Sequence, residues 1–160
     1  MAKSYYSAML NHSADDVWNV IRPFDHYAWA GVEGETTIED GKRGDQTSAI
    51  RRVAIGPKTI RQALLAHSDA DRSYTYAFVG QAPFRVRDCT ATIRVRPVVE
   101  TGDAFVEWWA TFDCEAAEVD KWTRYFEQDG FGKWLAALRK FMAAPERNSR
   151  SQLELAQSAN

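Results

Sequence analysis

The 160-residue chain is poor in cysteine and has no long apolar run. Its two thiols, Cys89 and Cys114, cannot build a disulfide framework, so we expect both to be reduced. No stretch approaches the roughly 18–20 consecutive apolar residues of a membrane span, so we expect no stable membrane insertion. The first residues form no apolar signal region either. The sequence therefore predicts a cytoplasmic protein.

Neither sign of charge is in marked excess, because 20 Lys and Arg stand against 22 Asp and Glu. A protein with this balance lacks the basic footprint of a nucleic-acid binder, and we expect no nucleic-acid partner. No pair of its three histidines has metal-ligand spacing, and no G-x-S-x-G nucleophile motif occurs. We expect neither a metal nor another cofactor.

Aromatic residues, in contrast, are abundant: six Trp, six Tyr and eight Phe. The length suits one domain with a core that needs no disulfide or metal support. We place this domain at residues 1–143 and expect residues 144–160, which are polar, to form a loose tail. Aromatic residues in such number indicate that something large is packed or bound.

The periodicity of apolar residues changes twice along the chain. After a strand at 3–10, Ser13 precedes Asp16 by three residues at the start of a helical pattern, as in a capping box. A second short helix is expected at 24–30. A period of two then predicts strands at 36–40, 47–55, 59–67, 73–79, 85–98 and 104–113, separated by short Gly-, Pro- and Asp-rich turns typical of hairpins. The helical period returns at 115–142.

This order predicts an α+β protein, a seven-stranded curled antiparallel sheet around one long C-terminal helix. Only that helix is large enough to cover one face of the sheet. A strongly twisted sheet cannot close tightly along a helix, so we expect a cavity of the kind that binds small ligands. An aromatic stripe should face it, with a kink expected at Gly130 and Gly132. The stripe comprises Trp122, Phe126, Gly130, Phe131 and Trp134.

Several segments carry a family resemblance, among them 49–53, 62–66, 71–76, 91–97 and 106–112, with Trp29 near the start and 134–139 near the end. Over residues 3–143 the chain resembles the polyketide cyclase/dehydrase-like branch of the SRPBCC (START, birch-pollen-allergen-like) superfamily. The resemblance implies the helix-grip fold in the order β-α-α-β6-α. It also implies binding of lipids, sterols, hormones, polyketides or alkaloid precursors between sheet and helix.

Carried over by position, the resemblance implies which residues line the cavity and which form its entrance. Residues 56–58 (Gly56, Pro57 and Lys58) match a gate-like loop, and 68–71 match a latch-like turn. Many relatives have Glu at the position of Gln62 and Tyr at that of Cys89, which argues against acid–base chemistry there. The implied lining residues are Arg51, Val53, Gln62, Tyr76, Phe78, Cys89, Ala91, Trp108, Ala110, Phe126, Phe131 and Trp134.

Arg51 is the most informative single residue, because alternation along its strand points it inward. A buried guanidinium needs partners, either a ligand carboxylate or enolate, or an acid of the chain such as Glu33 or Asp113. Gln62 could contact a ligand or satisfy neighbouring backbone. His67 could be a general base at the cavity mouth or a solvated strand-end residue.

The role of the inward aromatic side chains has two possible interpretations. Each could pack in the hydrophobic core or contact a ligand; the residues are Tyr76, Trp108, Phe126 and Trp134. The phenol of Tyr76 could serve as a hydrogen-bonding handle.

Three functions are compatible with these features. The first is non-covalent binding or carriage of an apolar or amphipathic small molecule (a lipid, polyketide or aromatic metabolite), whose polar end Arg51 and Gln62 orient. The second is a metal-free cyclase or dehydratase, a lyase or isomerase, in which Arg51 stabilises an enolate and Tyr76 or His67 donates protons. The third is a protein-interaction or regulatory module, a homodimer included, that uses the outward-facing Trp109.

Overall fold

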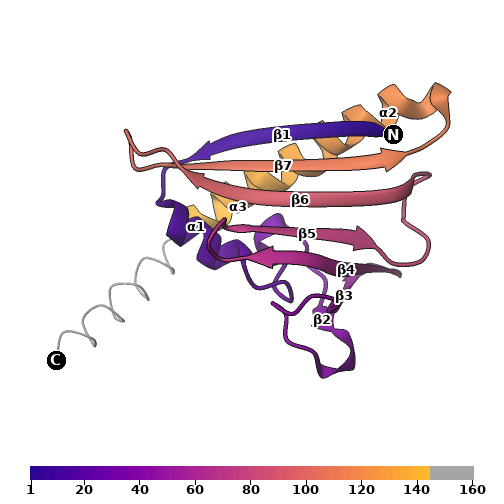
Figure 1. The fold of residues 1–160 in the computed structure, drawn as a ribbon, viewed down its shortest axis with the longest axis horizontal. Helices are drawn as coiled ribbons and strands as arrows, with labels where there is room; N and C mark the ends of the chain where they lie inside the picture. Colours follow the sequence, from indigo (N-terminus) through magenta and orange to yellow (C-terminus); the bar gives the residue numbers. More distant parts are fainter. Residues whose placement is uncertain (145–160) are drawn as a thin grey trace.

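The computed structural model describes residues 1–144. Seven strands pair antiparallel in one sheet of order β1-β7-β6-β5-β4-β3-β2. The α+β helix-grip architecture is thereby confirmed, whereas the predicted tail lies, apart from Ala144, outside the described residues. The strands (Figure 1) are β1 Ala2–Leu10, β2 Thr36–Ile38, β3 Ile50–Ile55, β4 Lys58–Ser68, β5 Ser73–Phe78, β6 Arg87–Pro97 and β7 Ala104–Asp113.

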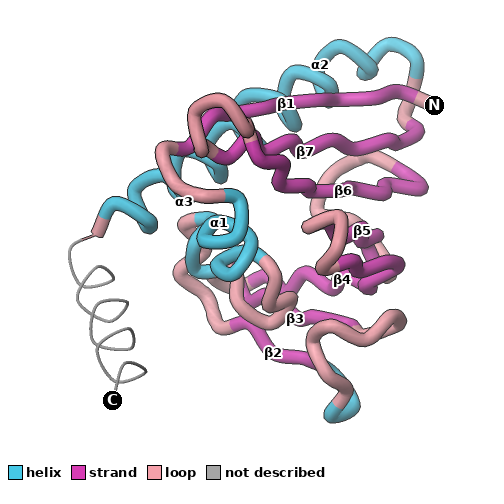
Figure 2. The backbone as a smooth tube through the Cα atoms, turned by 60° about the vertical axis from the view of Figure 1, so that its left-hand side comes forward, coloured by secondary structure: helices cyan, strands magenta, loops and turns pink. Residues whose placement is uncertain are grey.

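Helices α1, α2 and α3 lie on one side of the sheet, which curls around them (Figure 2). The predicted C-terminal helix is helical over nearly its whole length, but it contains three kinds of turn. The helical elements are α1 Ala14–Ile21, α2 Val119–Arg124 and α3 Lys133–Ala143, the π-helix η4 Tyr125–Gly132, and the 3-10 turns η1 Ala28–Ala30, η2 Glu39–Gly41 and η3 Ala116–Glu118.

Helix α1 begins where the sequence indicates. The Ser13 hydroxyl accepts a hydrogen bond from the backbone N–H of Asp16 at 3.1 Å, and acidic residues occupy the first turn. The helix ends before Pro23, whose nitrogen carries no hydrogen to continue the helical bonds, although Arg22 itself keeps a right-handed helical backbone. This part of the prediction is confirmed.

The second short helix, predicted at 24–30, is reduced to the 3-10 turn η1. A helix there would need the Phe24 carbonyl to accept from a backbone N–H one turn later. Instead the carbonyl oxygen accepts a hydrogen bond from Arg51 Nη1 at 3.3 Å. A tertiary contact has thus replaced the local one.

The irregularity expected at the two glycines of the C-terminal helix takes the form of the π-helix η4. A Cβ added to Gly132 would lie 2.9 Å from the Glu127 carbonyl oxygen and 3.3 Å from Tyr6 Cε2. The helix therefore approaches β1 as closely as it does because residue 132 has no side chain.

Alternation on β7 divides its side chains between core and outer face. On the outer face Glu107 pairs with Arg94 at 3.0 Å and Arg96 at 3.4 Å, and the Arg94 guanidinium lies 5.4 Å from the Trp109 ring centroid. Trp109 is half-buried there, and a homodimer through it stays a prediction. The inward side chains are all fully buried: Ala104, Val106, Trp108, Ala110 and Phe112.

Candidate ligand-binding site

Aromatic rings fill the space between the middle of the sheet and the C-terminal helix. The Trp108 ring stacks on Phe131 with centroids 5.1 Å apart, and it contacts Trp134 at 5.2 Å and Trp29 at 5.7 Å. Interiors packed in this way have few voids larger than a water molecule. Of the residues expected to line a cavity, several therefore lie in the core: Val53, Ala91, Trp108, Ala110, Phe126 and Phe131 are buried, and Trp134 is half-buried.

A groove opens instead at the end of the sheet where β5 passes into β6. Its volume of about 860 Å³ falls in the range of small-molecule pockets. Two of the expected ligand-binding residues, Phe78 and Cys89, line it. The remaining lining residues come from the flanks of these strands and from the segment before α2: Ala77, Gly80, Gln81, Ala82, Phe84, Arg85, Val86, Arg87, Asp88, Thr90, Glu115 and Glu118.

Phe84, on the loop between β5 and β6, separates this groove from the core. Its ring centroid lies 5.7 Å from that of Phe78, 5.2 Å from that of Tyr125 and 5.4 Å from that of Phe126. The side chain thus bridges the sheet and the C-terminal helix at the groove. Phe84 is not among the ligand-binding residues predicted from the sequence, although an aromatic residue at a Gly- and Pro-containing break is a visible signal.

Arg51 is fully buried and forms no ion pair with a carboxylate of the described chain. Its Nε donates to Gln62 Oε1 at 2.7 Å. The expected pairing with Glu33 or Asp113 is wrong: Arg51 lies among uncharged groups, and Asp113 pairs at 3.0 Å with the amino terminus. Gln62 is likewise engaged by Arg51, which neither of its two expected roles included.

Aromatic faces surround the Arg51 guanidinium. Its central carbon lies 4.2 Å from the ring centroid of Phe24, 4.1 Å from that of Tyr27 and 5.0 Å from that of Tyr76. Such contacts stabilise a cation through the negative face of each ring. Burial raises the pKa of Tyr27 to about 12 and that of Tyr76 well above its ordinary value, although the nearby Arg51 charge acts in the opposite direction. Both phenols therefore remain neutral near pH 7.

Four buried polar atoms of this interior have no hydrogen-bond partner within the described chain. They are Arg51 Nη2, Trp29 Nε1, Trp108 Nε1 and the Tyr74 hydroxyl. An indole or guanidinium N–H can only donate a hydrogen bond, whereas a neutral phenol can both donate and accept one. The interior between β3, β5 and β7 therefore contains several buried donor groups that have no acceptor among the described residues.

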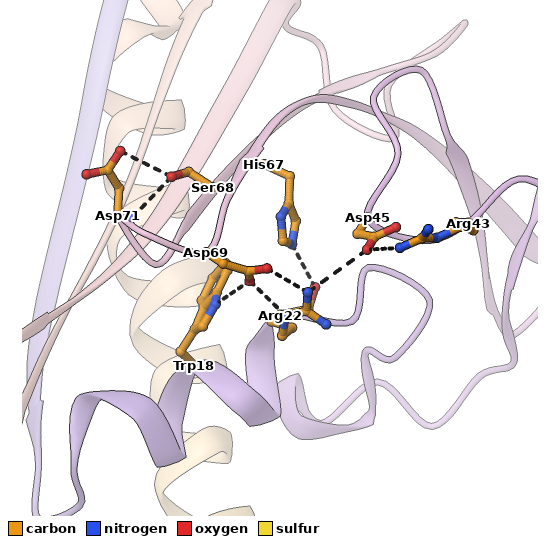
Figure 3. A network of polar contacts seen from close by, with 8 residues as sticks. All are labelled: Trp18, Arg22, Arg43, Asp45, His67, Ser68, Asp69 and Asp71. Atoms are coloured by element: carbon orange, nitrogen blue, oxygen red, sulfur yellow. Dashed lines mark hydrogen bonds and ion pairs between the residues drawn. The ribbon is translucent and has the colours of Figure 1, made fainter.

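His67 is the next-to-last residue of β4, and its cross-strand partner Tyr74 lies at the end of β5 away from the groove. The His67 ring points toward Arg22 (Figure 3). Its Nε2 is 3.3 Å from the Arg22 carbonyl oxygen, and its ring contacts those of Trp18 and Tyr74. It is half-buried, so it is not a freely solvated strand-end residue. Its role as a proton donor stays a prediction.

The turn expected to act as a latch is tied to α1 (Figure 3). Asp69 accepts hydrogen bonds from Trp18 Nε1 at 2.9 Å and from Arg22 Nε and Nη2 at 2.7 Å each. These bonds hold the pKa of the Asp69 carboxyl well below its usual range. Arg22 Nη2 also lies 4.0 Å from Asp45, so one guanidinium links two loops to the end of the helix.

Gly56, Pro57 and Lys58, expected to form a gate, make a tight hairpin between β3 and β4. The backbone pairs Ile55 with Lys58, which leaves a two-residue turn. All three residues are exposed, and none lines the groove. Their role as a gate stays a prediction.

A curled seven-stranded sheet gripping a C-terminal helix, with an adjoining groove, defines the helix-grip class of ligand-binding folds. A family model described as polyketide cyclase / dehydrase and lipid transport matches residues 1–145, so the chain belongs to that family. The resemblance to the SRPBCC superfamily is thereby confirmed. No curated protein sequence matches the chain.

Solved structures of similar fold include both bacterial and plant proteins. XoxI from Bacillus cereus is 27% identical with a TM-score of 0.75, and the alignment covers 88% of this chain and 94% of the XoxI chain. A protein from Bacillus thuringiensis is 26% identical with a TM-score of 0.77, and the alignment covers 89% of this chain and 100% of that protein's chain. Norcoclaurine synthase from Thalictrum flavum, in complex with dopamine and hydroxybenzaldehyde, is 13% identical with a TM-score of 0.68. The alignment covers 88% of this chain and 85% of the synthase chain. That last likeness concerns the fold alone.

Within residues 1–144, none of the helices has the length and apolar character that crossing a membrane requires. The cytoplasmic location stays a prediction. In the same residues no group of three or more His, Cys, Asp or Glu side chains is arranged to hold a metal ion.

Proposed function

We propose that the protein binds an apolar or amphipathic small molecule, a lipid, a polyketide or an aromatic metabolite, and that the molecule enters through the groove beside Phe84. The observation that carries this proposal is the groove itself, whose volume of about 860 Å³ suits one such molecule. Phe78 and Phe84 offer it apolar surface, while Arg85, Arg87 and Glu115 supply a charged, exposed rim.

Entry into the interior would require the Phe84 ring to break its contacts with Tyr125 and Phe126 of the C-terminal helix. Swinging the loop between β5 and β6 outward would join the groove to the aromatic interior around Phe126 and Phe131. The ligand would then replace ring contacts made by Phe84 with contacts of its own, and apolar burial would supply most of the affinity. The polar end would reach Arg51 and Gln62, because Gln62 is the cross-strand neighbour of the groove residue Phe78.

A cyclase or dehydratase activity in the same space is the second candidate function. The observation that favours it is the Arg51 guanidinium 5.0 Å from the Tyr76 ring. A buried cation could stabilise an enolate, and a phenol whose pKa burial has raised stays protonated and able to donate. Replacing Tyr76 with Phe would then abolish turnover of a polyketide-like substrate while leaving its binding within about threefold of the wild type.

Native mass spectrometry of the protein purified from cells, followed by a denaturing run, tests the binding function directly. We expect a stoichiometric apolar passenger, or uptake of added Nile red by the empty protein. The matched variants are Phe84→Ala, at the groove, and Val99→Ala, which truncates an exposed apolar side chain elsewhere. Phe84→Ala should change the rate of Nile red uptake at least about fivefold, and Val99→Ala should not. An empty wild-type protein that takes up no Nile red would refute the proposal.

A further inference from the structure

The interior holds a positive charge that the described chain does not neutralise. Arg51 is fully buried, and its two hydrogen bonds go to uncharged oxygens, Gln62 Oε1 and the Phe24 carbonyl. Burying a guanidinium without a counter-charge is unfavourable, and contacts with aromatic faces offset only part of that cost. The remaining nitrogen of the guanidinium, Nη2, has no hydrogen-bond partner among the described residues.

The groups packed against the rings that face the guanidinium can donate hydrogen bonds: the Trp29 indole N–H only donates, and the Tyr74 hydroxyl both donates and accepts. The rings of Phe24 and Tyr27, which face the guanidinium, contact at their edges the rings of Tyr74 and Trp29, respectively. Neither the Tyr74 hydroxyl nor Trp29 Nε1 has a well-formed hydrogen bond among the described residues. Burial raises the pKa of Tyr74 and the Arg51 charge acts in the opposite direction, so this phenol lies near the guanidinium. A carboxylate, which only accepts hydrogen bonds and can take about four, is the complement of such a set.

The distance from this cluster to the groove limits the size of the ligand. Arg51 pairs across strands with Gln62, and Gln62 pairs with Phe78, a lining residue of the groove. Two inter-strand steps amount to about 10 Å. A carboxylate at Arg51 with a body of two fused rings would therefore extend from the cluster to the groove.

From these three observations we infer that the ligand is a flat, aromatic carboxylic acid, whose carboxylate receives hydrogen bonds from Arg51 Nη2 and from the Tyr74 hydroxyl near it. The inference rests on the proposed function, which names only an apolar or amphipathic molecule, and it adds the sign of the charge. A neutral molecule of the same shape would leave Arg51 unneutralised. The site therefore discriminates between an acid and its amide.

Titration with 2-naphthoate and 2-naphthamide, which share one ring system and differ in charge, tests the inference. Calorimetry at pH 7 should show that the wild type binds the acid at least about tenfold more tightly, the effect expected of a charge-assisted hydrogen bond. Arg51→Met, which keeps an unbranched apolar stem, should bind the two equally. Arg52→Met, its exposed neighbour on the same strand, should retain the preference.

If Arg51→Met does not fold, a second variant tests whether the preference for the acid depends on the Arg51 charge. Gln62→Glu places a carboxylate where Gln62 Oε1 now accepts from Arg51, and so neutralises the guanidinium from within. It should lower the affinity for 2-naphthoate at least about tenfold and leave that for 2-naphthamide within about twofold.

The two proposals fail in different ways. Uptake of neutral Nile red without any preference of the wild type for the acid overturns the inference and leaves the proposed function in place. Failure to take up Nile red and both naphthalene compounds overturns the proposed function and the inference with it.

Discussion

Arg51 and Gln62 face each other across β3 and β4, and the guanidinium Nε donates to the amide oxygen at 2.7 Å. This bond is the shortest contact that holds the buried cation, since the Phe24 carbonyl oxygen lies 3.3 Å away. An amide in this place satisfies the guanidinium without neutralising it. The pair therefore keeps a full positive charge inside the protein, and both its stability and its ligand preference depend on residue 62.

Replacing Gln62 with Leu should destabilise the fold by about 2–3 kcal/mol, because a hydrogen bond to a buried charge is lost and Arg51 Nε is left without an acceptor. Urea unfolding followed by tryptophan fluorescence measures the change. Leu64→Ile, on the same strand and the same face, controls for altered packing and should cost less than about 1.5 kcal/mol. A Gln62→Leu variant within about 0.5 kcal/mol of the wild type would show that the bond contributes little.

The bonds between Asp69 and α1 should make stability depend on acidity. The Asp69 pKa is lowered in the folded state, first by the hydrogen bond from Arg22 and then by that from Trp18. A carboxyl group with a depressed folded pKa stabilises the protein fully above its unfolded value of 3.8, and the contribution disappears as the pH falls from there toward the folded pKa. Because both partners are well exposed, solvent screening limits this contribution to about 1 kcal/mol.

Thermal melts of the wild type and Asp69→Asn between pH 7 and pH 2 measure this dependence. The wild type should be the more stable at pH 7, and the difference should shrink below about pH 4. Asp71→Asn, in the same turn but with a side chain that accepts a hydrogen bond from the Ser68 hydroxyl and from no charged group of residues 1–144, is the matched control and should show a smaller difference. A constant gap between wild type and Asp69→Asn across the whole range would contradict the assignment.

Two glycines of the C-terminal helix should respond in opposite directions to alanine. A Cβ at residue 132 would lie 2.9 Å from the Glu127 carbonyl oxygen, which is backbone and cannot move cheaply, so Gly132→Ala should cost about 1–3 kcal/mol. At residue 130 the nearest atoms belong to the Trp134 ring at 3.4 Å. Gly130→Ala should be neutral or stabilising by up to about 1 kcal/mol, since alanine favours helix. Chemical denaturation of both variants tests the contrast, and equal losses would oppose it.

The sheet could be predicted from the sequence because its signals are local. Alternation on β7 marks Val106, Trp108 and Ala110 as inward, and all are fully buried. The register of β3 and β4 did not follow in the same way. The predicted strands 47–55 and 59–67 leave a three-residue break that would place Arg51 opposite Ala63, whereas the two-residue turn at 56–57 places it opposite Gln62.

Other features depend on contacts between distant segments, which local patterns do not specify. The Phe24 carbonyl bonds to Arg51, a residue 27 positions away, and that contact shortened the predicted helix. The π-helix reflects the close approach of Gly132 to Tyr6 on β1. Phe84 is visible in the sequence as an aromatic residue at a Gly- and Pro-containing break, but the sequence does not show where it meets the C-terminal helix, and the groove depends on that contact.

Cys89 reports on the groove through its reactivity. Burial raises the pKa of its thiol from 9.0 to about 12, so at pH 8 the thiolate that attacks disulfide reagents is about a thousandfold scarcer. Cys114 is half-buried and should react first with Ellman's reagent, which Cys89→Ser and Cys114→Ser proteins resolve into separate rates. Because Cys89 is buried and lines the same groove as Phe84, Phe84→Ala should accelerate its modification at least about tenfold, and a bound ligand should slow it. A Cys89 that reacts as fast as Cys114 in the wild type would mean that the groove is already open to the core in solution, and Phe84 would then have no role in controlling entry.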